Sequence, residues 1–266
     1  MRQLIITLLI AASGVCWSLV YVDSIRTGFK QKTYCMPLFA LGLNIAWEGI
    51  YAYTDLFVRG TIGAQAIANA VWFLLDIFIV VTYFKFGREE AEGELGRKWF
   101  VPWSVLVLVA CIVLQFLFIA EFGDVAGEKY SAYLQNIAMS VAYLYMLNRR
   151  KSSKGQTMLI AVSKCIGTLT PTIYGTMEGN TFILVTGIIC FIFDVIYIYF
   201  LHGIKKKERD AAGFQAFHMH SRFTAKKHLS VHPLTPNDTQ QMFCCYSCMG
   251  CSFLVFSIQR IRAELH

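Results

Sequence analysis

The stretch LNIAWEGIYAY (residues 43–53) places one carboxylate, Glu48, inside a run of apolar and aromatic residues. The chain has 266 residues, of which 56% are hydrophobic and 15% are charged, whereas an ordinary soluble domain carries about 25% charged residues. Its apolar blocks have roughly the 20 residues that a helix needs to cross a bilayer. Because backbone polar groups in hydrocarbon must be satisfied internally, these blocks are predicted to be helices and the fold class all-α.

Seven such blocks follow one another, which predicts a polytopic membrane bundle with seven transmembrane helices. The predicted spans are residues 4–22, 35–53, 69–86, 101–122, 130–148, 157–176 and 181–201. The first block is too long for the apolar region of a typical signal peptide, and no clear cleavage site with small residues follows it. We therefore treat it as the first span.

Lysine and arginine are concentrated in every second loop. The loops after spans one, three and five and the segment after span seven contain Arg26, Lys30, Lys32, Lys85, Arg88, Arg97, Lys98, Arg149, Arg150, Lys151, Lys154 and the KKKER run at residues 205–209. The intervening loops contain Arg59 and Lys129. Since cytosolic loops of membrane proteins carry the excess of lysine and arginine, the N-terminus is predicted to be lumenal or extracellular and the C-terminus cytosolic.

The sequence predicts two parts, a seven-span membrane domain over residues 1–203 and a basic cytosolic tail over residues 204–266, which we expect to be poorly ordered. The net charge of +7 is accounted for by the asymmetry of the loops and by a tail lying near anionic membrane lipid. Without a basic module interleaved with aromatic residues, no nucleic-acid partner is expected. The tail contains CCYSCMGC at residues 244–251, for which palmitoylation fits about as well as metal binding; we predict no metal site.

Few polar side chains lie inside the spans, and helical spacing groups some of them. Asn44, Glu48 and Tyr51 fall on one helix face, and Asp194 and Tyr197 are neighbours one turn apart. A charged group at the centre of a bilayer costs about 2.5–3.5 kcal/mol on insertion scales, so such groups usually face the bundle interior and serve a function. The candidates for a supporting pocket are Asn44, Trp47, Tyr51, Asp76, Gln135, Asn136, Lys164 and Tyr197.

Three acids and one base lie well inside the spans. Asp76 or Asp194 can form a structural ion pair with Lys164, but one lysine cannot neutralise all three acids. We predict that Glu48 and Asp194 are the catalytic residues, and leave open which of them donates a proton. Because burial disfavours the charged form of a carboxylic acid, a buried acid retains a proton and can act as a general acid. A dry, aromatic chamber of this kind suits the protonation of an epoxide or alkene in an apolar substrate.

Several motifs of other enzymes are absent from the sequence. It has no DDxxD or DxDD stretch, no P-loop, no Rossmann fingerprint, no HExxH and no GxSxG. No cofactor is therefore expected.

The sequence resembles the small integral-membrane terpene cyclases of fungal meroterpenoid and indole-diterpene pathways. The resemblance covers roughly residues 25 to 203 and rests on the stretches FKQKTYCMPLFALGLNIAWEGIYAY, VWFLLDIFIVVTYFKFG, YLQNIAMSVAYLYML, KCIGTLTPT and FIFDVIYIY, in the order of the family. The sequence departs from the family by about sixty residues after the last span. That tail is either functional or an artefact of the gene model.

The resemblance implies a seven-span protein of the endoplasmic reticulum that needs no metal. It implies that Glu48 and Asp194 protonate the terminal epoxide of a prenylated substrate, which then cyclises through carbocations. A farnesyl-bearing aromatic or polyketide substrate of a meroterpenoid pathway is favoured, with an indole diterpene as the alternative. The implied pathway partners are a prenyltransferase and an epoxidase.

The sequence disfavours two non-enzymatic classes, a seven-span receptor and a transporter. A seven-span receptor would be expected to carry Asp-Arg-Tyr after span three and Asn-Pro-x-x-Tyr in span seven, and a retinal protein a lysine in span seven; the sequence has none of these. A transporter would often show an internal repeat, which is also missing. The substrate, its ring stereochemistry, the base that ends the reaction and the oligomeric state are left open.

Overall fold

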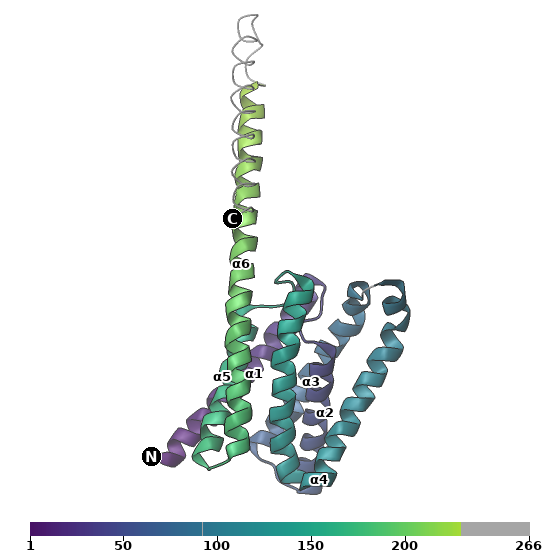
Figure 1. Ribbon diagram of the computed structural model, residues 1–266, viewed down its shortest axis with the longest axis vertical. Coiled ribbons are helices and arrows are strands. Elements are labelled where there is room, and N and C mark those ends of the chain that lie inside the picture. Colours follow the sequence, from purple (N-terminus) through teal and green to yellow (C-terminus); the bar gives the residue numbers. More distant parts are fainter. Residues whose placement is uncertain (92, 230–266) are drawn as a thin grey trace, which may run out of the picture. The chain divides into compact units, whose positions relative to one another are not determined.

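The computed structural model describes residues 1–91 and 93–229, with side chains as far as residue 214 (Figure 1). The prediction of an all-α fold is confirmed for these residues, which form six α-helices: α1 (Arg2–Gln31), α2 (Leu38–Tyr53), α3 (Ala64–Phe86), α4 (Gly93–Arg150), α5 (Met158–Met177) and α6 (Thr181–Leu229). A π-helical turn, η1 (Thr54–Val58), follows α2, and a 3-10 turn, η2 (Gly87–Glu90), follows α3.

The helix α4 consists of two helical stretches that meet at Gly123. This residue has φ of 74° and ψ of 169°, which is not a helical conformation and which glycine adopts without a steric penalty. The ribbon of α4 reverses direction along its length (Figure 1), and Gln115 Nε2 of the first stretch donates to Gln135 Oε1 of the second over 3.2 Å. The break lies between the predicted fourth and fifth spans.

Four helical segments among the described residues are long and apolar enough to cross a membrane. They are Arg2–Gln31, Ala64–Glu90, Gly93–Arg150 and Thr181–Phe214. The shorter helices α2 and α5, with 16 and 20 residues, do not meet the same criterion. The count of seven spans therefore stays a prediction.

Contacts divide the chain into two units, Met1–Glu208 and Arg209–His266. In the unit Met1–Glu208, α1 packs against α3 and α5, and α2 packs against both α3 and α4. Large side chains that are fully buried fill the centre, among them Tyr21, Leu41 and Ile79. Many large apolar side chains point outward from α1, α3, α4 and α6, as expected where helices face lipid. The cysteine cluster at residues 244–251 lies outside the described residues.

The helix α1 extends beyond its predicted span, which ended at residue 22, as far as Gln31. Its polar last part is held by contacts with a distant loop, because the buried carboxylate of Asp23 accepts a hydrogen bond from Thr157 Oγ1. Lys32 ends the helix in the left-handed conformation, with φ of 49°. Hydropathy found the apolar part of this helix and not its polar continuation.

The loops that are rich in lysine and arginine lie together at one end of the helices. Glu90, at the end of η2, accepts hydrogen bonds from Arg150 Nη2 at 2.8 Å and Nε at 3.1 Å and from Thr33 Oγ1 at 2.5 Å. The backbone N–H of Gly155 donates to Gln31 Oε1 over 2.7 Å. These bonds join the predicted cytosolic loops to one another, while the orientation of the chain in a membrane stays a prediction.

The buried ion pair between Arg150 and Glu90 predicts a loss of stability in Arg150→Leu. The side chains of Arg150 and Glu90 are only 6% and 17% exposed. The substitution removes a cation from beside the buried Glu90 carboxylate, and it is expected to lower the free energy of unfolding by about 3 kcal/mol. Arg149→Leu is the matched control, because the one hydrogen bond of the Arg149 side chain among the described residues goes to the Tyr34 hydroxyl. Thermal unfolding in detergent measures both, and equal melting temperatures for the two variants would contradict the prediction.

Candidate active site

Polar side chains from three helices meet at Asn44. Its Nδ2 atom lies 2.9 Å from Oε1 of Glu48, one turn further along α2. It also lies 2.9 Å from Oδ2 of Asp76 on α3 and 2.6 Å from the hydroxyl of Tyr21 on α1. The helical period places Asn44 and Glu48 on one face of α2. Tyr21 and Asp76 reach them because α3 packs against both α1 and α2.

Tyr21 was not among the residues predicted from the sequence. Its hydroxyl donates a hydrogen bond to Glu48 Oε1, and its ring stacks on Trp72 with centroids 5.9 Å apart and planes 18° apart. Trp72 is itself held by a hydrogen bond of 3.1 Å from Nε1 to Ser18 Oγ. The one signal in the sequence was a phenol inside the first apolar span, which membrane proteins commonly contain for packing alone.

The acids of this cluster have no cationic partner among the described residues. Glu48 and Asp76 are 1% and 0% exposed, and Glu48 Oε2 and Asp76 Oδ1 accept no hydrogen bond from the described residues. The two carboxyl groups lie within hydrogen-bonding reach of each other. Two ionised carboxylates buried side by side would carry a large desolvation and repulsion cost. The cluster is therefore expected to hold at least one proton, as a general acid requires.

A cavity of about 270 Å³ lies against this cluster. Among the predicted site residues, Asn44, Trp47, Glu48, Gln135 and Asn136 line it. Much of the remaining wall is aromatic and comes from Trp17, Tyr21, Trp72, Tyr133 and Tyr174. We call this space the chamber. It combines an acid with aromatic faces, which can stabilise a nearby positive charge.

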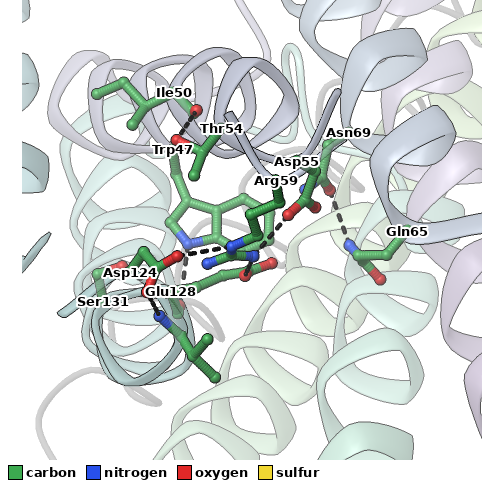
Figure 2. Close-up of polar contacts among 11 residues, drawn as sticks. Trp47, Ile50, Thr54, Asp55, Arg59, Gln65, Asn69, Asp124, Glu128 and Ser131 are labelled. Carbon is green, nitrogen blue, oxygen red and sulfur yellow. Dashed lines mark hydrogen bonds and ion pairs between the residues drawn. The ribbon is translucent and has the colours of Figure 1, made fainter. Parts of the chain in front are cut away.

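A group of charged residues around Arg59 holds one part of the chamber wall (Figure 2). Arg59 Nη1 lies 2.5 Å from Asp55 Oδ1 and 3.5 Å from Glu128 Oε2, and its Nε lies 2.7 Å from Asp124 Oδ2. Figure 2 also shows Trp47, whose Nε1 donates to the carbonyl oxygen of Glu128 over 3.0 Å. Trp47 and Glu128 both line the chamber, so these bonds tie its wall to η1 and to the start of the second stretch of α4.

Asp194 lies in a separate polar group, away from the chamber wall. Its two oxygens are 2.8 Å and 3.0 Å from Nζ of Lys164, which also donates to Ser140 Oγ over 2.7 Å. Both charged side chains are 1% exposed. Lys164 therefore pairs with Asp194 rather than with Asp76, which resolves the alternative left open by the sequence. A catalytic role for Asp194 stays a prediction.

Two further predicted pocket residues lie outside the chamber lining. Tyr197 donates from its hydroxyl to Gln156 Oε1 over 3.0 Å, and its ring contacts Tyr143. Tyr51 is buried with its ring centroid 5.4 Å from that of Trp47, so it supports the wall from behind. Among the described residues, no group of three or more His, Cys, Asp or Glu side chains is arranged to hold a metal ion.

Comparisons with known proteins agree with the resemblance drawn from the sequence. The family of Pyr4-like transmembrane terpene cyclases matches residues 1–207. The Pyr4-family terpene cyclase mfmH of Annulohypoxylon moriforme is 31% identical over 163 residues, which are 60% of this chain and 66% of that protein. The terpene cyclase pyr4 of Aspergillus fumigatus is 26% identical over 210 residues, or 74% of this chain and 86% of that protein.

A third relative, the asnovolin H synthase nvfL of Aspergillus novofumigatus, is 26% identical over 161 residues, which are 59% of this chain and 63% of that protein. The chain thus spans slightly less than two thirds of the length of mfmH and nvfL. No solved structure matches. Since the family match covers most of the chain, including the helices that carry the Asn44 cluster and the chamber, this protein belongs to the Pyr4-like transmembrane terpene cyclases, a family of integral membrane proteins.

Proposed function

We propose that this protein is a membrane-bound terpene cyclase that protonates the terminal epoxide of a farnesyl-bearing aromatic or polyketide substrate in meroterpenoid biosynthesis. The observation that carries the proposal is the position of Glu48, an acid without a cationic partner among the described residues, on the wall of an aromatic chamber. The names of the relatives, which include terpene cyclases and an asnovolin H synthase, support this class of reaction.

The proposed reaction begins with transfer of a proton from Glu48 to the epoxide oxygen. The O–H bond of the acid breaks, a new O–H bond forms on the epoxide, and a C–O bond of the epoxide breaks to leave a hydroxyl group and a carbocation. Alkenes of the same chain attack in turn and close the rings, and loss of one proton to a base ends the sequence. The product is an isomer of the substrate, and Glu48 must regain a proton before the next turnover.

The chamber contributes in two ways to this proposal. Its aromatic faces, which include Trp17, Trp47 and Trp72, stabilise carbocations through their negative ring faces. Its apolar side chains, together with a bound apolar substrate, would limit access of water, which would otherwise trap the cation as an alcohol. No step of the reaction calls for a cofactor.

The wider setting follows from the same proposal. A lipophilic substrate that dissolves in the membrane would be supplied by a prenyltransferase and an epoxidase, since the reaction consumes an epoxidised prenyl chain. We place the protein in the endoplasmic reticulum, as the family resemblance implies. The distribution of lysine and arginine predicts a lumenal N-terminus and a cytosolic C-terminus.

Glu48→Gln is expected to lower the cyclisation rate by about 10²-fold to 10⁴-fold, the usual contribution of a positioned general acid. Glutamine keeps the shape of the side chain and accepts the hydrogen bond from Tyr21, but it has no proton to transfer. Membranes containing the protein are incubated with an epoxyfarnesyl-arene and, separately, with an epoxygeranylgeranyl-indole. The products are separated by chromatography, and an isomer of unchanged mass identifies cyclisation.

Glu121→Gln is the matched control, because Glu121 is exposed and lies outside the chamber lining. Full activity of Glu48→Gln at normal protein levels would contradict the proposed role of this acid. Conversion of the indole substrate alone would move the protein to the indole-diterpene branch.

Removal of either member of the ion pair between Lys164 and Asp194 is expected to destabilise the protein. The variants Lys164→Met and Asp194→Leu each leave one buried charge without its partner, at a cost of about 3–5 kcal/mol. The double variant contains neither charge and is expected to recover most of the loss. Melting temperatures in detergent test this, and a double variant as unstable as the less stable single variant would contradict it. Cyclisation by the recovered double variant then reports whether Asp194 has a role beyond the ion pair.

A further inference from the structure

We propose that Tyr21 is a positioning residue for the acid Glu48. Tyr21 and Asn44 both donate hydrogen bonds to Oε1 of Glu48, and the transferable proton is therefore held on Oε2. The inference rests on the proposed role of Glu48 as the acid. The inference specifies the oxygen atom of Glu48 that carries the proton. It also identifies Tyr21, which lies outside α2, as the residue that determines the position of the proton.

The hydrogens available in the cluster support the assignment. The Tyr21 hydroxyl has one hydrogen, and the acceptor within its reach among the described residues is Glu48 Oε1. The Asn44 amide has two hydrogens for three nearby oxygens, one of which is the same Oε1 at 2.9 Å. A proton on Oε1 would face the Tyr21 hydrogen directly. Oε1 therefore acts as the carbonyl oxygen of the acid, and the acid hydrogen belongs on Oε2, which accepts no hydrogen bond among the described residues.

The position of Tyr21 is fixed by its surroundings. Its side chain is 2% exposed, and the stacked ring of Trp72 covers one face. A hydrogen bond from Trp72 to Ser18, one turn before Tyr21 on α1, holds the indole in place. The hydroxyl is thus aimed at Glu48 by α1 and α3, and it does not depend on the bound substrate for its orientation.

The same hydrogen bonds strengthen when the proton leaves. Glu48 becomes a carboxylate, and bonds from Tyr21 and Asn44 to a charged acceptor are stronger than bonds to a neutral one. A donor that binds the product state of a proton transfer more tightly than the reactant state lowers the barrier for that transfer. Tyr21 therefore acts on the rate of protonation through Glu48, and it need not touch the epoxide.

The test compares Tyr21→Phe with Tyr143→Phe in the membrane cyclisation assay. Both changes remove one buried hydroxyl, but the hydroxyl of Tyr143 has no hydrogen-bond partner among the described residues. Tyr21→Phe is expected to lower kcat by about 10-fold to 100-fold, the effect of a hydrogen bond to a charged group, with KM changed little. The solvent deuterium isotope effect on kcat is expected to increase, because proton transfer becomes more rate-limiting. Tyr143→Phe should keep both values of the unsubstituted protein.

An infrared measurement tests the proton position without any substrate. The difference spectrum between the unsubstituted protein and Glu48→Gln isolates the C=O stretch of the protonated Glu48. Loss of the donor to Oε1 in Tyr21→Phe is expected to move this band to higher frequency, while Tyr143→Phe leaves it in place.

The outcomes separate this inference from the proposed function. A shifted band with a reduced kcat supports the inference, whereas an unshifted band or full activity in Tyr21→Phe overturns it. Should the unsubstituted protein cyclise neither substrate, the proposed function fails, and the infrared band alone still decides where the proton lies. If a variant accumulates poorly in membranes, the C=O stretch of its Glu48 is measured by infrared spectroscopy after purification in detergent.

Discussion

The amide of Asn44 is the interaction on which the site depends. An apolar interior makes an isolated charge very costly, and here two acids, Glu48 and Asp76, lie inside it at the contact of α2 with α3. Asn44 gives both of them a donor from a single side chain. It holds α2, α1 and α3 together at that point while adding no charge, so the acids remain free to hold a proton.

The second polar group of the interior, formed by Lys164 and Asp194, lowers the cost of a buried acid in a different way. Asp194 is paired with Lys164, whose Nζ lies 2.8 Å and 3.0 Å from its two oxygens. Glu48 and Asp76 have amide and phenol partners, which stabilise an acid without removing its proton. The two groups therefore differ in the chemistry that they can perform, although both consist of buried carboxylates on membrane helices. This difference is the reason for assigning the proton transfer to Glu48.

The polar contacts at the helix ends help to maintain the shape of the chamber. At one end, Glu90 and Arg150 join the loops that are rich in lysine and arginine. Toward the other side of the chamber, Arg59 joins η1 to the second stretch of α4, and Trp47 is bonded to the backbone of Glu128. A chamber formed by six helical segments keeps its shape only if these segments keep their spacing, and the contacts at their ends restrict that spacing.

Local patterns in the sequence were enough for the class of the fold and for part of the site. Hydropathy predicted the apolar helices, and the break in α4 falls at Gly123, close to the predicted division between two spans. The helical period put Asn44 and Glu48 on one face, because residues four apart on a helix are neighbours whatever surrounds them. The polar end of α1 was missed, because a helix that continues out of an apolar environment carries no hydropathy signal.

Composition and helical spacing are local properties, and they were sufficient to predict an all-α membrane protein with an acid, Glu48, beside an amide on one helix face. The pairing of Lys164 with Asp194, and the contacts of Tyr21 and Asp76 with the pair Asn44 and Glu48, became apparent from the folded structure alone. The hydrogen-bonded pairs that join different helices in these groups are 23 to 32 positions apart in the sequence. Which of them meet is set by the way the helices pack, and helical periodicity carries no information about that.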